Sequence, residues 1–232
     1  MKALSYRGYR FPPVIIQYAV WLYLRFTLSL RDVQDLLAER GIIVSHETIR
    51  RWVISFGPIY ARRLRAMRPT PTGRWHLDEV FVSITGRQMY LWRAVDDEGE
   101  VLDVLVQARR DKDAALRLMR KLLKNHGLVP TSIITDRYRA YDAALRELGV
   151  SHMHRRGKRL NNRAERSHVP IRRRERKMQG FRSAGSAQRF LFCHSATYNT
   201  FNITRHLITA NTHRILRSQA FDAWDAAVAA ST

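Results

Sequence analysis

The sequence predicts an α/β protein that carries an all-α domain at its N-terminus. Two observations lead to this fold class: apolar residues recur at helical spacing to about residue 67, and strand-like and helix-like segments then alternate. The change follows a linker with two prolines and a glycine, residues 68–73. We therefore expect a helical domain over 1–67, an α/β domain over 68–205 and a C-terminal tail over 206–232.

Three helices are expected in the first domain. Pro12 and Pro13 suit the first turn of the first helix. The second begins after Ser29, which acts as its N-cap, and ends at Gly41. Ser45 caps the third helix, whose apolar face includes Ile49, Trp52 and Val53. Its outward-facing residues are expected to be His46, Glu47, Arg50 and Arg51.

The last two of these helices, joined by a glycine turn, have the pattern of a helix-turn-helix. In that motif the second helix enters the major groove of DNA, so its four outward-facing residues are candidate DNA contacts. The alternative is an ordinary helical hairpin with a solvated polar face. The overall charge of the chain favours the helix-turn-helix.

That charge points to a polyanionic partner. The chain has 232 residues, 41 Lys and Arg against 20 Asp and Glu, and a formal net charge of +21. Such a surface attracts nucleic acid. An acidic membrane surface is disfavoured, because no apolar segment is long enough to span a bilayer. The single cysteine, Cys193, excludes an intramolecular disulfide framework, and with no signal-peptide pattern the expected setting is cytoplasmic.

The second domain is expected to begin with an antiparallel meander of three strands joined by short turns. An amphipathic helix, a short buried strand, a second helix and a brief last strand follow, which gives the order β-β-β-α-β-α-β. The expected strands are 74–84, 88–95, 101–107, 131–135 and 151–154, and the expected helices are 111–126 and 138–148. Residues 184–205 are amphipathic and are expected to close the core.

Three acidic residues stand out by their places on these elements. Asp78 lies within the first strand, Asp136 directly follows the fourth, and Glu165 lies in an arginine-rich segment after the last. A carboxylate in a buried strand is costly unless it is paired or binds a metal. Carboxylates are the ligands of hard divalent ions, and two such ions about 4 Å apart catalyse displacement at phosphorus. The pattern therefore indicates metal-dependent chemistry on nucleic acid.

Each acid also has a purely structural interpretation. Asp78 would be a satisfied strand-edge aspartate beside a solvent-facing Glu79, Asp136 would cap the next helix, and Glu165 would neutralise nearby arginines. The occurrence of all three at these topological places favours the catalytic interpretation.

The arginine-rich stretch 155–182 is interpreted as a phosphate-binding surface along the same site, because few acids relieve its charge. A solvated helix face is the alternative. The candidate DNA contacts here are Arg163, Arg166, Arg173, Arg174, Arg176 and Lys177. His152 and His154 alternate on the last expected strand and are interpreted as ordinary half-exposed residues rather than as metal ligands.

The motifs named above resemble those of DDE transposases of bacterial insertion sequences, and among them the IS6 (IS26-like) family. The element order likewise resembles the ribonuclease H-like fold, in which the first acid lies on the first strand, the second after the fourth, and the third on a later helix. The stretches that carry the resemblance are 6–12, 36–41, 45–53, 75–79, 91–96, 135–136 and 161–176.

The resemblance implies a ribonuclease H-like core that cuts one strand at each terminal inverted repeat and joins the 3′ ends to target DNA, by replicative, cointegrate-type transposition. Asp78, Asp136 and Glu165 would bind Mg²⁺ or Mn²⁺, two ions per site, and Arg172 would contact the terminal phosphate. The implied partner is double-stranded DNA at the nucleoid. At least a dimer is expected, because two element ends must be held together, and the tail 206–232 with an exposed Trp224 is a candidate oligomerisation segment.

Two questions stay open at this level. Pro170 lies between Glu165 and Arg172, so either one kinked helix or a new helix that starts at the proline is expected. The function classes that compete with a transposase are a ribonuclease H-like nuclease or resolvase that does not join strands, and a non-catalytic helix-turn-helix regulator.

Overall fold

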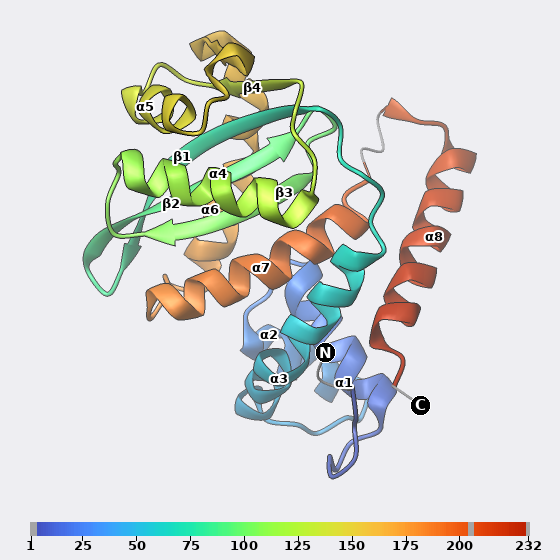
Figure 1. Ribbon diagram of the computed structural model, residues 1–232. Coiled ribbons are helices and arrows are strands. Elements are labelled where there is room, and N and C mark those ends of the chain that lie inside the picture. The colour runs from blue at the N-terminus through green and yellow to red at the C-terminus, as the bar shows by residue number, and fades with distance from the viewer. Residues whose placement is uncertain (1–3, 204–206, 231–232) are drawn as a thin grey trace. The chain divides into compact units, whose positions relative to one another are not determined.

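The computed structural model describes residues 4–203 and 207–230, with the side chains of 158 and 159 left aside. The chain divides into two compact units (Figure 1): Met1–Arg68 together with Phe192–Thr232, and Pro69–Leu191. Residues 192–203 thus group with the N-terminal helices, whereas the sequence pattern places them in the α/β domain. The reason is aromatic packing, because the ring of Phe201 lies 5.8 Å from that of Trp21.

The first unit confirms the three expected helices. The Ser29 side chain accepts a hydrogen bond from the backbone N–H of Asp32, and the Asp32 carboxylate accepts one from the backbone N–H of Ser29, which forms a capping box. Ser45 caps the third helix. Gly41 takes a φ of 72°, which suits glycine after a helix end. The helices of this unit are α1 (Pro13–Arg25), α2 (Leu30–Ala38), α3 (His46–Ala66), α8 (Ala210–Val228) and the last part of α7 (Ala184–Phe201).

Helix α8 is held against α3 within the same unit. The Tyr6 hydroxyl donates a hydrogen bond of 2.7 Å to the carbonyl of Val228, and the Trp224 ring lies 5.5 Å from that of Tyr60. Trp224 is only 5% exposed. The expectation that Trp224 is exposed for a partner subunit is therefore wrong, because the side chain is already packed against the chain itself.

The second unit contains one mixed sheet with the strand order β3-β2-β1-β4-β5. Its first three strands form the expected antiparallel meander, and β4 and β5 run parallel to β1. This topology confirms the ribonuclease H-like order β-β-β-α-β-α-β. The strands are β1 (Arg74–Ile84), β2 (Arg87–Asp96), β3 (Val101–Gln107), β4 (Ser132–Thr135) and β5 (His154–Arg156), and the helices are α4 (Lys112–His126), α5 (Arg139–Glu147), α6 (Asn162–Lys177) and the start of α7.

The last strand differs from the expected one. Residues Ser151–Met153 form a 3-10 turn, and β5 begins only at His154, which pairs with Ile133 of β4. The His154 ring is 7% exposed and lies within hydrogen-bond distance of the Thr135 hydroxyl, at 2.8 Å. It is therefore a buried structural residue, whereas His152 on the turn is exposed.

Helices cover both faces of the sheet (Figure 1). Trp75 and Leu77 of β1 join the apolar core formed with α4 and α5. Side chains alternate along a strand, so Asp78 faces the other side, where α6 lies and its His168 contacts Asp78. Within the described part of the chain, no helix is long and apolar enough to cross a membrane.

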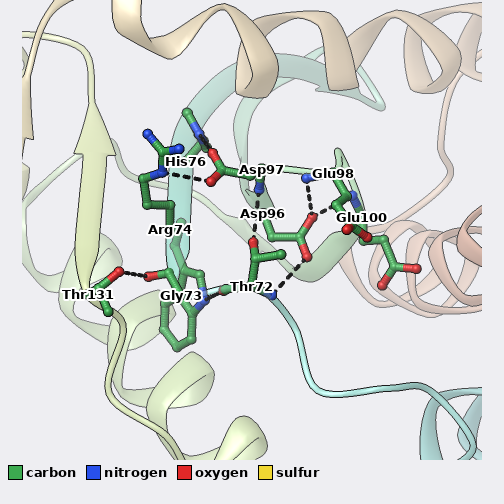
Figure 2. A network of polar contacts seen from close by, with 10 residues as sticks. Thr72, Gly73, Arg74, His76, Asp96, Asp97, Glu98, Glu100 and Thr131 are labelled. Atoms are coloured by element: carbon green, nitrogen blue, oxygen red, sulfur yellow. Dashed lines mark hydrogen bonds and ion pairs between the residues drawn. The ribbon is translucent and has the colours of Figure 1, made fainter. Parts of the chain in front are cut away.

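The start of β1 is fixed by a polar network at the β2–β3 turn (Figure 2). Asp96 accepts backbone hydrogen bonds from Glu98 and Glu100 at 3.1 and 2.9 Å, and its other oxygen accepts one from Thr72 at 3.4 Å. Asp97 bonds His76 of β1 at 3.0 Å. The N-terminal end of the strand that carries Asp78 is therefore held to the β2–β3 turn by these hydrogen bonds.

Candidate active site

The strand register relates two of the three candidate acids. Strands β1 and β4 pair from Arg74 with Ser132 to His76 with Ile134, a constant offset of 58 residues. Two residues beyond the last pair, the same offset corresponds to Asp78 and Asp136. Because neighbouring strands are about 4.8 Å apart, we expect the two carboxylates to lie near each other.

The two aspartates have different hydrogen-bond partners. Oδ2 of Asp78 lies 3.1 Å from Nε2 of His168 on α6. Oδ1 of Asp136 accepts the backbone N–H of Tyr138 at 2.9 Å, which closes the turn before α5. Helix α5 has Tyr138 as its N-cap and no side-chain cap hydrogen bond, so Asp136 closes the turn before the helix and does not cap it. Burial lowers the pKa of His168, and its hydrogen bond to Asp78 opposes that shift.

Glu165 and Arg172 lie on the same helix. Helix α6 runs without a break from Asn162 to Lys177 with Pro170 inside it, which settles the open question of its continuity. Glu165 is exposed and forms no ion pair among the described side chains, so it does not act by neutralising neighbouring arginines. The Arg172 guanidinium is exposed and lies 5.7 Å from the ring centre of Phe81 on β1.

The donor set fits a hard divalent cation in chemistry but is not assembled into a complete site. Asp78 and Asp136 are related by the strand register, and carboxylate oxygens are the ligands that Mg²⁺ and Mn²⁺ prefer. Among the described residues, however, no three His, Cys, Asp or Glu side chains form a group that holds a metal ion. Glu165 remains an exposed side chain on the adjacent helix, one turn before His168.

Glu79 has a place that the sequence interpretation missed. Its side chain is 1% exposed, accepts a hydrogen bond of 2.6 Å from the Tyr141 hydroxyl and pairs with Arg110 at 2.6 Å. Burial raises the pKa of Glu79, although both partners oppose the shift. Glu79 is therefore not the solvent-facing neighbour of Asp78. The signal was its period-two spacing from Trp75 and Leu77, which puts it on the same face of the strand.

The basic residues of α6 are not equivalent. Arg174 is 2% exposed, and its guanidinium carbon lies 5.1 Å from the ring centre of Phe190. This burial differs from the expected DNA-contacting role and gives Arg174 a packing role instead. The exposed members of the predicted set are Arg163, Arg166, Arg173, Arg176 and Lys177.

The candidate DNA-contacting residues of α3 lie together at its N-terminal end. Nε of Arg50 donates a hydrogen bond of 2.8 Å to Oε2 of Glu47. The other carboxylate oxygen of Glu47, Oε1, lies 3.8 Å from Nε of Arg51. Both arginines are exposed. The backbone N–H of His46 donates to the side chain of Gln34 on α2 at 2.7 Å, which ties the two helices together.

Known proteins share sequence with most of this chain. A family model for the DDE domain matches residues 72–203. The chain is 32% identical over 198 residues to the transposase for insertion sequence-like element IS431mec of Staphylococcus aureus (strain Mu50 / ATCC 700699), and 31% identical over 198 residues to that for element IS257 in transposon Tn4003 of Staphylococcus aureus. Each match covers 83% of this chain and 88% of the relative.

A solved structure is also similar. The catalytic core domain of BIV integrase aligns with a TM-score of 0.42 and 14% identity, over 66% of this chain and 99% of that one. The family assignment rests on the domain match and on the two transposases, which span most of the chain. The chain belongs to the DDE transposases of bacterial insertion sequences, in the IS6 family, whose members cleave and join DNA.

Proposed function

We propose that this transposase binds the terminal inverted repeats of its insertion sequence, hydrolyses one strand at each end with the help of Mg²⁺ or Mn²⁺, and joins each new 3′ end to target DNA. The product would be the cointegrate of replicative transposition. The observation that supports the proposal is the strand register, whose offset relates Asp136 to Asp78, together with the contact of α6 with Asp78 through His168.

The proposed chemistry consists of two displacements at phosphorus. Water attacks the phosphorus at the element end and the bond to the 3′ oxygen breaks, and the freed 3′-hydroxyl then attacks a target phosphorus and releases the target 3′ oxygen. Asp78, Asp136 and Glu165 would hold two divalent ions, which when bound supply an activated nucleophile and stabilise the leaving oxygen. Arg172 would bind the terminal phosphate through its planar guanidinium.

The DNA would be held by both units. In the first unit, Arg50 and Arg51 would reach the element end from α3, with Glu47 fixing the orientation of Arg50. In the second, the exposed basic residues of α6 would bind phosphates beside the acids. A net charge of +21 supports a partner of opposite charge, at the nucleoid in the cytoplasm. Two copies would hold the two ends.

A strand-transfer assay tests the proposal. Purified protein, labelled DNA that carries the element end, and an unlabelled target are incubated with Mg²⁺, with Mn²⁺ or with a chelator. Joined product that needs the metal and is absent with Asp136→Asn is expected. Cleavage without joining would instead indicate the nuclease, and binding with neither reaction would indicate the regulator.

A further inference from the structure

His168 of α6 bonds Asp78 on the face of the sheet opposite to the core that contains Trp75 and Leu77. Its Nε2 lies 3.1 Å from Oδ2 of Asp78, and the two side chains are 6% and 14% exposed. An ionised carboxylate only accepts hydrogen bonds, so the hydrogen lies on Nε2. Among the described residues Asp78 has no other hydrogen-bond partner, so its Oδ1 stays available to a ligand.

The residue before His168 makes a parallel contact on the neighbouring strand. Asp78 of β1 lies opposite Arg93 of β2 in the sheet. Arg93 is fully buried and its Nε donates to the Ser167 hydroxyl at 2.9 Å, while that hydroxyl donates to the Ala164 carbonyl at 2.6 Å. Two consecutive residues of α6 thus bind two facing residues of the sheet.

A third contact fixes the start of the same helix. The Asn161 side chain, directly before α6, donates to the Leu77 carbonyl at 2.8 Å. Asn161 and His168 therefore attach α6 to two consecutive residues of β1, Leu77 and Asp78. Glu165 lies on the helical turns between these two attachments, so its backbone position relative to Asp78 is set by them.

We propose that His168 is a positioning residue, which orients the Asp78 carboxylate and attaches the helix of Glu165 to the strand of Asp78, so that the three acids can bind a divalent cation. The proposal rests on the proposed metal-dependent function. It deepens that function by assigning a role to a residue outside the acidic triad. The physical reason is that a ligand whose rotamer is held by a neighbouring hydrogen bond loses less freedom when the cation binds.

The length of the side chain at position 168 provides the test. Glutamine carries its amide nitrogen about as far from the backbone as Nε2 of histidine, whereas the amide of asparagine ends near the place of Nδ1 and falls short of Asp78. His168→Gln should keep the hydrogen bond, and His168→Asn should lose it. His168→Leu fills the buried space without a donor, and serves as the second loss variant if His168→Asn does not fold.

The chain offers a matched control on the same strand. His76 is 5% exposed, and its Nε2 lies 3.0 Å from Oδ1 of Asp97, so this buried histidine pairs with an aspartate that is not a candidate ligand (Figure 2). His76→Asn removes that bond by the same change of side chain. Any effect of general destabilisation should appear in both variants.

The readout is the Mn²⁺ concentration that half-saturates the full chain, measured from the loss of the electron paramagnetic resonance signal of free Mn²⁺, together with Tm and the rate of strand transfer. We expect His168→Asn or His168→Leu to raise this concentration about 10–100-fold, the usual effect of losing a partner that orients a metal ligand. His168→Gln should stay within a few-fold of the wild type, and His76→Asn should lower Tm without moving the midpoint.

Two outcomes overturn the inference alone. A wild-type midpoint in His168→Asn and His168→Leu would show that the hydrogen bond is not needed, and an equal shift in His76→Asn would show a purely structural effect. If the wild type itself shows neither a metal-induced rise in Tm nor metal-dependent joining, the proposed function fails and the role of His168 fails with it.

Discussion

Strand β1 takes part in two histidine–aspartate pairs, each with a buried histidine, which are bonded differently. In the first pair, at the start of the strand, Asp97 accepts from His76 through Oδ1 at 3.0 Å and from Arg74 through Oδ2 at 2.7 Å. In the second pair, Asp78 is bonded by His168 through Oδ2 at 3.1 Å and has no other partner among the described residues.

The difference teaches what distinguishes a structural acid from a ligand-binding one. Asp97 has both oxygens occupied, one of them by a permanent cation, so a metal ion would have to displace Arg74. Asp78 is oriented by one donor and keeps its second oxygen, and the strand register relates Asp136 to it. The first pair therefore joins the start of the strand to the β2–β3 turn, whereas the second leaves one oxygen of Asp78 available to the proposed ligand.

The largest expected effect is on strand transfer. Asp78→Asn should lower the rate of strand transfer by about 10²–10³-fold or more. The change removes the negative charge that would bind the cation, and with the cation the stabilisation of the transition state. Asp97→Asn makes the same change in the pair whose carboxylate is bonded through both oxygens, and its rate of strand transfer should stay within a few-fold of the wild type. The measurement is the initial rate of joined product, with equal binding of the DNA as the check on folding. Equal loss in both variants would remove the distinction between the pairs.

The second effect is on stability in the presence of metal. A cation that binds only the folded chain stabilises it by about 2.7 kcal/mol at 100 times its Kd, which corresponds to a Tm rise of roughly 5–10 °C for a chain of this size. Thermal unfolding with and without Mn²⁺ should show this rise in the wild type and in Asp97→Asn. Asp78→Asn and Asp136→Asn should lack it. A rise retained in Asp78→Asn would place the metal elsewhere.

The smallest effect concerns acid pH. Burial opposes the ionisation of Asp97, but the hydrogen bonds from His76 and Arg74 outweigh it and lower its pKa. Ionised Asp97 therefore stabilises the fold above the unfolded pKa of about 3.9, and this contribution is lost as the pH falls through the folded pKa.

The stability difference between the wild type and Asp97→Asn should accordingly be constant near neutral pH and shrink below about pH 4. Its size should be under about 1 kcal/mol, because a partly exposed ion pair is screened by solvent. Urea unfolding midpoints across this pH range measure it. A difference that is unchanged in acid would mean that the ion pair contributes nothing.

Much of the fold followed from local patterns. Strand β1 has the expected bounds, and the caps at Ser29 and Ser45 are where the sequence put them. Continuity of α6 through Pro170 was not readable, because a proline removes one hydrogen bond whether or not packing compensates. Here His168 and Ile171, on either side of it, are 5% and 1% exposed and pack the helix onto the sheet.

Two misread residues show where local reasoning fails. Arg174 was grouped with its exposed neighbours by composition, although its spacing of seven from Ser167 and three from Ile171 puts it on the buried face of α6. Glu79 is solvent-facing in the structural interpretation of Asp78, because side chains alternate along a strand. Helices cover both faces, and Arg110 and Tyr141 provide the partners that a buried carboxylate requires.

By itself, the sequence determined the order of the elements, the places of Asp78, Asp136 and Glu165 on them, and the basic charge that indicates DNA, because these depend on residues close together in the chain. Only the tertiary structure decided which side chains meet. The contacts of His168 with Asp78 and of Ser167 with Arg93 join residues that lie far apart in the sequence. The periodicity of the sequence does not predict such pairs, since they depend on how a helix packs against strands that are distant in the chain.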